Sequence, residues 1–374
     1  MKKFSDIHIG LQFFAQAGDV VNATNQYVNA YTGTPTPFTD GQTLAPTMKE
    51  FYDTALLENA RPKMVYAQFG KRQPLPKNHG GRVEWRKFNT FARASKLTEG
   101  VIPTGQKLSM TKIYGEIEQY GTYTTISDRL ELRGYDPIIM GATEEMGASG
   151  AETQEILIRD ALLVNTNVLY CDNINPATGA DASGSGVVVT PTSCAQMEAS
   201  ATAMSMLTPR MVNKAVTVMK KNRVPLINGK YFAVIHPSVA YNLREHDDWI
   251  SVHKYDASTE IFNGEIGELH GVRFIEDDLA PVLSTVGSTS YKNKANGVTY
   301  ATYFFGADSF GIIDPEAGGM EMIVKSKEQI GGPLDQFSTV GYKFESNGAT
   351  ILYSERCLRV MSCTSFSAED EANV

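Results

Sequence analysis

Apolar and polar residues alternate along two stretches in the first third of the chain. Val83 and Trp85 alternate with charged neighbours, and beyond a stretch rich in Gly, Pro and Thr, Ile113, Ile117 and Tyr123 alternate with polar positions. A period of two is typical of β-strands, so the pattern predicts a long two-stranded hairpin over residues 81–128. An isolated hairpin is marginally stable in water, so we expect it to lie against another surface. Its predicted tip consists of Thr98, Glu99, Gly100, Val101, Ile102, Pro103, Thr104 and Gly105.

A helical period follows the hairpin. Asp136 is suited to the N-cap and Pro137 to the first helical position, and apolar or small residues then follow one face as far as residue 163. About 29 residues at 1.5 Å each would span roughly 43 Å. Each glycine costs up to about 1 kcal/mol relative to Ala, so we expect either a break in the helix or the close approach of another backbone. The glycines concerned are Gly141, Gly147 and Gly150.

The second half of the chain alternates between strand and helix signals. The segment TPRMVNKAVTVMKKN predicts a helix with Thr208 as N-cap, Pro209 at the first position, and Lys220 and Lys221 at the end. A second helix is expected at SVAYNLREHDDWISV. Strands are expected at YFAVIHP, GVRFIE, TYATYFFG, FGIID and GMEMIVK, and two more in the segment STVGYKFESNGATILYSERCLRVMSC. A polar tail is expected from Ser365.

The N-terminal part has a different character. Residues 18–38 are polar and rich in Asn, Thr and Gly, which predicts an extended arm that cannot fold alone. A helix is expected behind Thr47, ending or kinking at Pro62. The first 18 residues imitate a signal peptide, but Asp6 and His8 interrupt the apolar run. No later segment reaches the roughly 20 apolar residues of a membrane helix, so we expect a soluble intracellular product.

Composition and charge narrow the function classes. The net charge is −8, with 34 basic and 42 acidic residues, whereas a protein that coats nucleic acid normally carries a positive charge. The four cysteines are too few and too widely spaced for a disulfide framework, so free thiols are expected.

Two motifs could carry chemistry in the stretch GEIGELHGVRFIEDDLAP. A phosphate-binding loop needs a strand before its glycines and a helix after them, and here a strand follows instead. Gly264, Gly267 and Gly271 are therefore interpreted as turn residues that permit a positive φ. Glu276, Asp277 and Asp278 could hold a hard cation, but a solvated turn closed by Pro281 is the preferred interpretation.

The segment REHDDWISVHK offers the best enzymatic candidate. His246 and His253 lie seven residues apart, about two helical turns, which is too far for one zinc ion. A metal-dependent hydrolase that uses His246, Asp247 and Asp248 remains the alternative function. A tail-tube or other virion structural subunit is a third hypothesis.

The order of these elements resembles a known family. A polar arm, a long hairpin, a long helix, an α/β region and terminal strands together resemble the major capsid protein of a tailed bacteriophage, which has the Hong Kong 97 fold. The phrase FNGEIGELHGVRFIEDDLAP resembles a segment of the N4-like branch, and KYFAVIHPSVAYNLR resembles the strand and helix that precede it. The phrase LQFFA is similar to the start of many phage structural proteins.

The resemblance implies an α+β fold in four parts. Residues 1–76 would be the N-terminal arm, 77–128 the extended loop, 129–207 with 326–374 the peripheral domain around the spine helix, and 208–325 the axial domain. The tip of the extended loop would contact a neighbouring subunit, and the glycines of 264–271 would lie in an axial-domain turn.

The resemblance also implies the function and the partners. The chain would form hexamers and pentamers of an icosahedral shell that encloses double-stranded DNA without binding a specific sequence. It would have no enzymatic activity, cofactor or metal, and no membrane partner. Expected partners are a separate scaffolding protein, a portal, and a decoration or minor capsid protein. Assembly is expected in the cytoplasm of a host bacterium.

Overall fold

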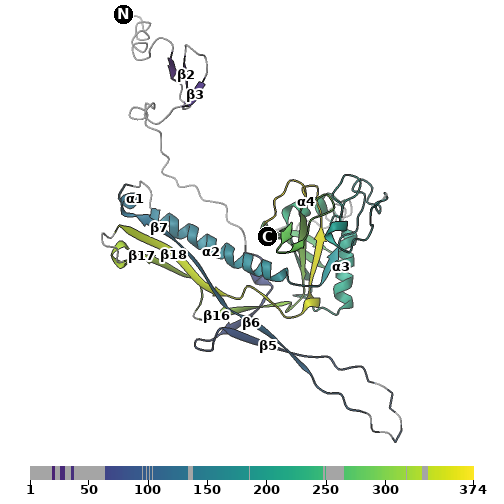
Figure 1. Ribbon diagram of the computed structural model, residues 1–374. Helices are drawn as coiled ribbons and strands as arrows, with labels where there is room; N and C mark the ends of the chain where they lie inside the picture. Colours follow the sequence, from purple (N-terminus) through teal and green to yellow (C-terminus); the bar gives the residue numbers. More distant parts are fainter. Residues whose placement is uncertain are drawn as a thin grey trace, which may run out of the picture. The chain divides into compact units, whose positions relative to one another are not determined.

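The computed structural model describes most of the chain (Figure 1). It describes residues 19–21, 26–29, 35–37, 64–94, 96–97, 99–100, 102, 104–133, 138–184, 186–246, 249, 265–316, 318–330 and 336–374. Two compact units are present, Met1–Asn59 and Ala60–Val374. The helix expected behind Thr47 lies outside the described residues, as do Asp136, Pro137 and Gly264.

The N-terminal unit contains three short antiparallel strands. β1 (Asp19–Val21) pairs with β2 (Gln26–Asn29), which pairs with β3 (Pro35–Pro37). Strands are extended backbone, so these pairs lie within the expected extended arm over 18–38, and the arm's inability to fold alone stays a prediction. Strands of three or four residues make a marginal sheet on their own.

The second unit contains a mixed sheet of seven strands with the order β10-β11-β9-β15-β20-β8, and β12 paired to β15. Its strands are β8 (Val168–Tyr170), β9 (Tyr231–Ile235), β10 (Glu265–Leu269), β11 (Val272–Glu276), β12 (Val282–Leu283), β15 (Thr299–Phe305) and β20 (Cys357–Ser362). Every residue of β15 and β20 is buried, as expected for strands at the centre of a covered sheet. The sheet therefore forms the core of this unit.

Two helices pack on this sheet where the sequence predicts them. α3 (Pro209–Lys221) begins behind Thr208, whose side chain accepts a hydrogen bond from the backbone N–H of Met211. Its apolar face is buried against the sheet, which confirms the predicted helix and cap. α4 (Pro237–Arg244) ends at Arg244, so it is shorter than the helix expected over SVAYNLREHDDWISV.

A second sheet supports the long helix. α2 (Ile138–Leu162) lies along the antiparallel sheet of β7 (Glu118–Ser127), β18 (Phe337–Ser346) and β17 (Glu321–Lys325) (Figure 1). The Tyr342 hydroxyl lies 3.4 Å from Ser149 Oγ and 3.3 Å from Thr153 Oγ1. The helix continues through its glycines, so the expected alternative of a break at Gly147 and Gly150 is wrong.

A hairpin projects from the unit (Figure 1). β5 (Arg82–Phe88) pairs with β6 (Met110–Glu116), from Arg82 opposite Glu116 to Phe88 opposite Met110. The predicted return strand was longer, and this is a correction: residues 118–127 form β7, which pairs with β18 instead of β5. The alternation was read correctly, but it spans two strands that belong to different sheets.

The root of the hairpin lies beside a third sheet. β4 (Lys71–Leu75) pairs in parallel with β16 (Phe310–Pro315), which also pairs with β19 (Thr350–Ile351). The remaining short elements are α1 (Asp128–Arg133), α6 (Lys327–Ile330), β13 (Thr285–Val286), β14 (Thr289–Ser290), and the 3-10 turns η3 (Tyr66–Gln68), η4 (Cys194–Gln196) and η5 (Ser354–Arg356).

Strand pairing divides the chain differently from the expected boundaries. Residues 60–76, expected in the N-terminal arm, belong to the second unit. The terminal residues 326–374 were expected to stay with the spine helix, but β18 pairs with β7 and β20 pairs with β15 of the seven-stranded sheet. The four-part division itself stays a prediction.

Candidate functional site

The hairpin is anchored at its root by one tryptophan. Trp85 of β5 lies against two positions without side chains, Gly115 on β6 and Gly311 on β16. A Cβ on either glycine would come within 2.8 Å of the indole ring. The alternation that predicts β5 puts Val83 and Trp85 on one face of the strand, and Trp85 on that face joins the hairpin to the sheet of β16.

The outer end of the hairpin is held by few contacts. The last backbone hydrogen bond between its sides, among the described residues, runs from Asn89 N–H to the Ser109 carbonyl at 3.0 Å. Beyond it the Gln106 side-chain amide donates to the Ala92 carbonyl at 3.1 Å. The described residues of this end form no core. Its conformation depends on β5, on β6 and on the contacts of Trp85 at the root.

The expected tip is exposed wherever the structure describes it. Ile102 is 94% exposed, and Glu99, Gly100, Thr104 and Gly105 are also exposed. The other three tip residues lie outside the described part: Thr98, Val101 and Pro103. An almost fully exposed isoleucine at the end of a projecting hairpin is a candidate contact with another molecule.

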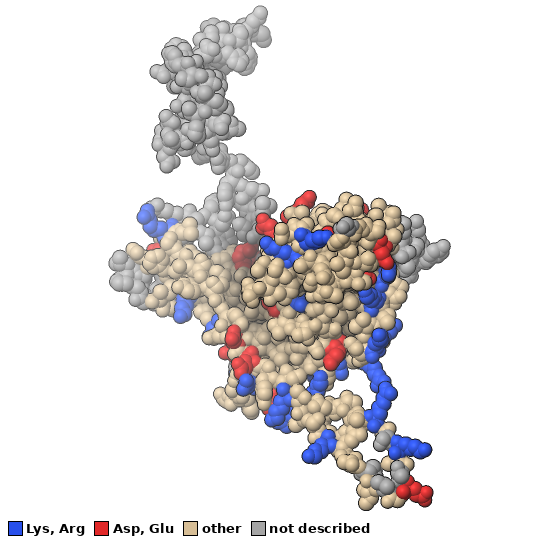
Figure 2. Space-filling model, turned by 45° about the vertical axis from the view of Figure 1, so that its right-hand side comes forward, with Lys and Arg blue, Asp and Glu red and all other residues tan. Residues whose placement is uncertain are grey.

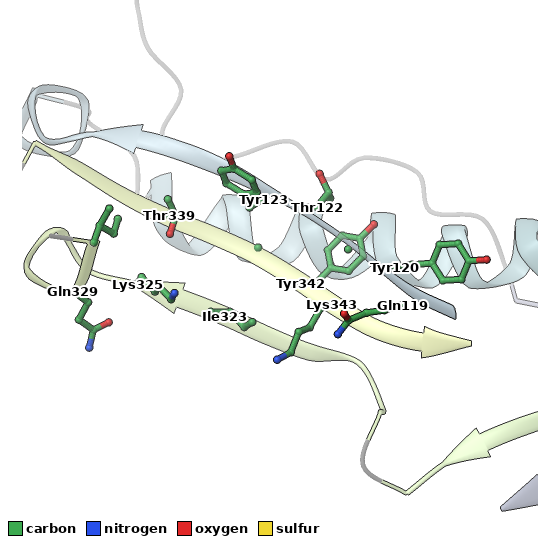
Figure 3. Close-up of a pocket in the computed structure, with 13 residues that line it drawn as sticks. Gln119, Tyr120, Thr122, Tyr123, Ile323, Lys325, Gln329, Thr339, Tyr342 and Lys343 are labelled. Atoms are coloured by element: carbon green, nitrogen blue, oxygen red, sulfur yellow. The ribbon is translucent and has the colours of Figure 1, made fainter. Parts of the chain in front are cut away.

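A groove lies on the sheet of β7, β17 and β18 (Figure 3). Its volume is about 570 Å³, and Tyr123, Ile323 and the two lysines Lys325 and Lys343 line it. Tyr123 is 72% exposed. The groove runs over strands, and its described lining residues include no acid and no histidine.

The glycines of the stretch GEIGELHGVRFIEDDLAP set the backbone conformation of a hairpin. β10 and β11 form a hairpin whose turn is His270 and Gly271, with φ values of 52° and 79°. This confirms Gly271 as a turn residue. Gly267, with a φ of 143°, is not in the turn, because it lies inside β10 at an irregularity of the strand register. The element that directly follows Gly271 is the strand β11 and not a helix, so the described part of this stretch lacks the helix N-terminus of a phosphate-binding loop.

The acidic triplet is only partly solvated, which corrects the expectation of a solvated turn. Glu276 forms an ion pair with Arg244 at 2.9 Å, and Asp278 is exposed. Asp277 is 2% exposed, and burial raises its pKa to about 7. Its Oδ1 accepts a hydrogen bond from Leu279 N–H at 3.2 Å, while its Oδ2 is buried without a partner among the described residues.

Glu155 is a second buried carboxyl, which the sequence patterns did not predict. Glu155 of α2 is fully buried, and its Oε1 accepts hydrogen bonds from the backbone N–H groups of Val65 and Tyr66. Burial raises the pKa of Glu155, and its charge in turn raises the pKa of Asp277. The only signal in the sequence was an acid within the apolar stripe of the helix. Through these hydrogen bonds Glu155 holds residues 65–66 against α2.

The enzymatic alternative finds no assembled site in the described part of the chain. His246 lies at the rim of a depression of about 530 Å³ beside Tyr241 and Glu245. Asp247, Asp248 and His253 lie outside the described residues. Among the described residues, no group of three His, Cys, Asp or Glu side chains is placed to hold a metal ion. All four cysteines are buried and free, as expected.

A projecting hairpin that is anchored at its root and exposed at its described outer end is typical of proteins that act by contact with other molecules. The family model described as phage capsid protein matches residues 111–351, about two thirds of the chain. The chain therefore belongs to the phage capsid protein family. No curated protein sequence matches it.

Solved capsid structures share the fold over nearly their whole length. The capsid of cyanophage Pam1 is 12% identical with a TM-score of 0.62, covering 89% of this chain and 100% of that chain. The capsid of Ralstonia phage GP4 is 14% identical with a TM-score of 0.59, covering 91% and 100%. For the Helicobacter pylori bacteriophage KHP30 capsid the values are 8% and 0.62, covering 87% and 99%.

Family and fold together confirm the expected Hong Kong 97-like α+β fold and the expected function as a capsid protein of the tailed-phage type. Its place is the capsid of the virion. In the described part of the chain, no helix is both long and apolar enough to cross a membrane.

Proposed function

We propose that this chain is the major subunit of an icosahedral phage shell, where it forms hexamers and pentamers around double-stranded DNA through its projecting hairpin. The observation that carries the proposal is the hairpin itself. Its large apolar side chains are exposed instead of being buried in a core: Phe88 is 66%, Phe91 54%, Leu97 68%, Ile102 94% and Leu108 63% exposed.

The exposed apolar side chains of the hairpin are typical of one half of a protein–protein interface. Monomeric proteins seldom expose contiguous apolar surface, and a larger patch commonly marks a contact with another protein. A neighbouring copy is the natural partner, since a capsid protein works as one of many copies in a shell. The tip, residues 98–105, would then cover part of the adjacent subunit. The glycines of α2 and of β10 would act on the backbone conformation within one subunit.

A scaffolding protein, a portal and a decoration or minor capsid protein are further partners in this proposal, with assembly in the host cytoplasm. The DNA would be enclosed without sequence-specific contacts, and the chain would need no catalysis. The expected N4-like branch stays a prediction. Particle shape separates this proposal from a tail-tube subunit, which would make rings or cylinders. An activity lost on chelation would favour a hydrolase.

Two changes at the hairpin test the proposal. Deletion of residues 97–107 should leave a soluble, folded subunit that forms no shells, because the anchor at Trp85 is untouched. Ile102→Asp should lower the shell yield in the same way with a smaller structural change. Val164→Asp is a matched control, because Val164 is 78% exposed and follows α2 instead of belonging to the hairpin.

The measurements are circular dichroism for folding and negative-stain microscopy with sedimentation for shells. Shells at wild-type yield from both hairpin variants would show that the hairpin is not a subunit contact. A wild-type chain that forms only cylinders would replace the shell proposal with the tail-tube hypothesis.

A further inference from the structure

Charge is distributed very unevenly along this chain. Residues 82–116, the projecting hairpin, contain seven lysines and arginines and three glutamates, a net charge of +4, although the whole chain carries −8. The rest of the chain therefore carries −12. Such a separation of positive and negative charge affects how molecules associate and does not determine the fold. A subunit with one basic arm and an acidic remainder is complementary to another copy of itself.

The structure places this positive charge on the projecting hairpin. Figure 2 shows blue side chains following the hairpin toward its outer end. Near the root the cations have partners: Arg82 lies 2.7 Å from Glu116, and Lys112 lies 3.5 Å from Glu84. The root is therefore partly neutralised within the subunit.

The outer end is different. Three exposed cations there form no ion pair within the described residues: Arg93, Lys96 and Lys107. Like charges held near one another on a narrow two-stranded arm repel, and a partner that supplies carboxylates relieves that repulsion. The end of the arm therefore carries charge that the subunit itself does not balance.

The apolar residues beside these cations help to identify the partner. The apolar residues of the outermost part, Leu97, Ile102 and Leu108, are aliphatic and strongly exposed, whereas the exposed aromatic residues Phe88 and Phe91 lie on β5 and just beyond it. Single-stranded nucleic acid is usually held by basic residues with aromatic side chains that stack on bases, and aliphatic side chains supply no such stacking. A mixed apolar and basic surface suits a protein whose own surface is acidic.

We infer that the basic hairpin, residues 82–116, docks on an acidic surface of a second copy of this chain, and that this electrostatic attraction speeds subunit association. The inference rests on the proposed function, since it names the chemistry of the contact that the hairpin makes. Complementary charge acts mainly on the rate of encounter and is screened by salt. Assembly should therefore slow as the salt concentration rises.

The test neutralises the outer cations and compares assembly rates. The triple variant Arg93→Gln, Lys96→Gln and Lys107→Gln should assemble about tenfold more slowly than wild type at 50 mM NaCl, as expected when steering is lost. At 1 M NaCl, where the screening length is about 3 Å, the two rates should agree. Light scattering of the full-length chain follows the rate, and circular dichroism checks the fold.

Two further variants separate arm charge from other causes. Lys220→Gln, Lys221→Gln and Arg223→Gln change the net charge equally at exposed positions near the end of α3, and they should assemble at the wild-type rate. The conservative variant Arg93→Lys, Lys96→Arg and Lys107→Arg keeps the charge and should also match wild type. Equal slowing in the α3 variant would overturn the inference, because net charge rather than the arm would be responsible.

Other outcomes also decide the question. If the neutralised arm assembles at the wild-type rate at every salt concentration, the inference is wrong, while shells formed by both proteins leave the proposed function standing. If neutralisation instead abolishes binding of a 30-base-pair DNA duplex and leaves assembly unchanged, the arm contacts nucleic acid rather than a second copy. A wild-type chain that makes no shells overturns the proposed function itself.

Discussion

Asp277→Asn should make the subunit more stable at pH 8, and by clearly less at pH 5. The carboxyl of Asp277 is buried, and its pKa is raised from 3.8 to about 7. At pH 5 the carboxyl is protonated in the folded protein but ionised in the unfolded chain, so only part of the loss of stability has occurred. Above pH 7 it must ionise inside the protein beside Glu155, whereas an asparagine remains neutral at every pH.

The size of the effect follows from the pKa difference. Because the folded-state pKa lies above the unfolded one, the stability that the proton confers is complete below pH 4. It is lost as the pH rises to about 7. A shift of roughly three pKa units at 1.36 kcal/mol each gives a loss of about 4 kcal/mol at most. Roughly two of these units lie between pH 5 and pH 7, so the gain of the variant should be about 3 kcal/mol larger at pH 8 than at pH 5. The backbone hydrogen bond from Leu279 is kept, because the asparagine oxygen can accept it.

Urea unfolding of the dissociated full-length subunit, followed by fluorescence at pH 5 and pH 8, measures this difference. Glu355→Gln is the control, because Glu355 is exposed and is not among the groups that raise the pKa of Asp277, so its replacement should have little effect at either pH. If wild type and Asp277→Asn showed the same change in unfolding free energy between the two pH values, the buried carboxyl would not be the cause, and the argument would fail.

Three further predictions concern other parts of the chain. Gly147→Ala should raise the free energy of unfolding by up to about 1 kcal/mol, because a Cβ there meets nothing within 4 Å. Gly150→Ala should gain less, since its Cβ would lie 2.6 Å from a methionine methyl group; equal gains, measured by thermal unfolding, would contradict this. Limited proteolysis should cut residues 18–38 in free subunits and spare them in particles, and equal cleavage in both would count against an arm ordered by assembly. Elemental analysis of particles should find no stoichiometric zinc, manganese or iron, and His246→Ala with His253→Ala should still assemble; metal lost in that variant would revive the hydrolase hypothesis.

The sequence predicted well those elements whose cause is local. Thr208 and Pro209 predict the start of α3, because a side-chain oxygen at the N-cap and a proline at the first position act within one turn. Gly271 predicts the β10–β11 turn for the same reason, since its positive φ is a property of one residue. The alternation around Trp85 predicts which face of β5 turns inward.

Only the tertiary structure decided what depends on contacts between distant residues. The alternation over 113–124 is real, yet residues 118–127 pair with β18, more than 200 positions further along the chain. A period of two reports that a strand is half buried and says nothing about its partner. The burial of Asp277 could not be predicted either. Three consecutive acids suggest a solvated turn, whereas in the folded chain Asp277 is buried and close enough to Glu155 of α2 for the two carboxyl groups to interact. Alternation and capping act through neighbours in sequence, whereas strand partners and the burial of a charge are set by which surfaces pack together in the folded chain.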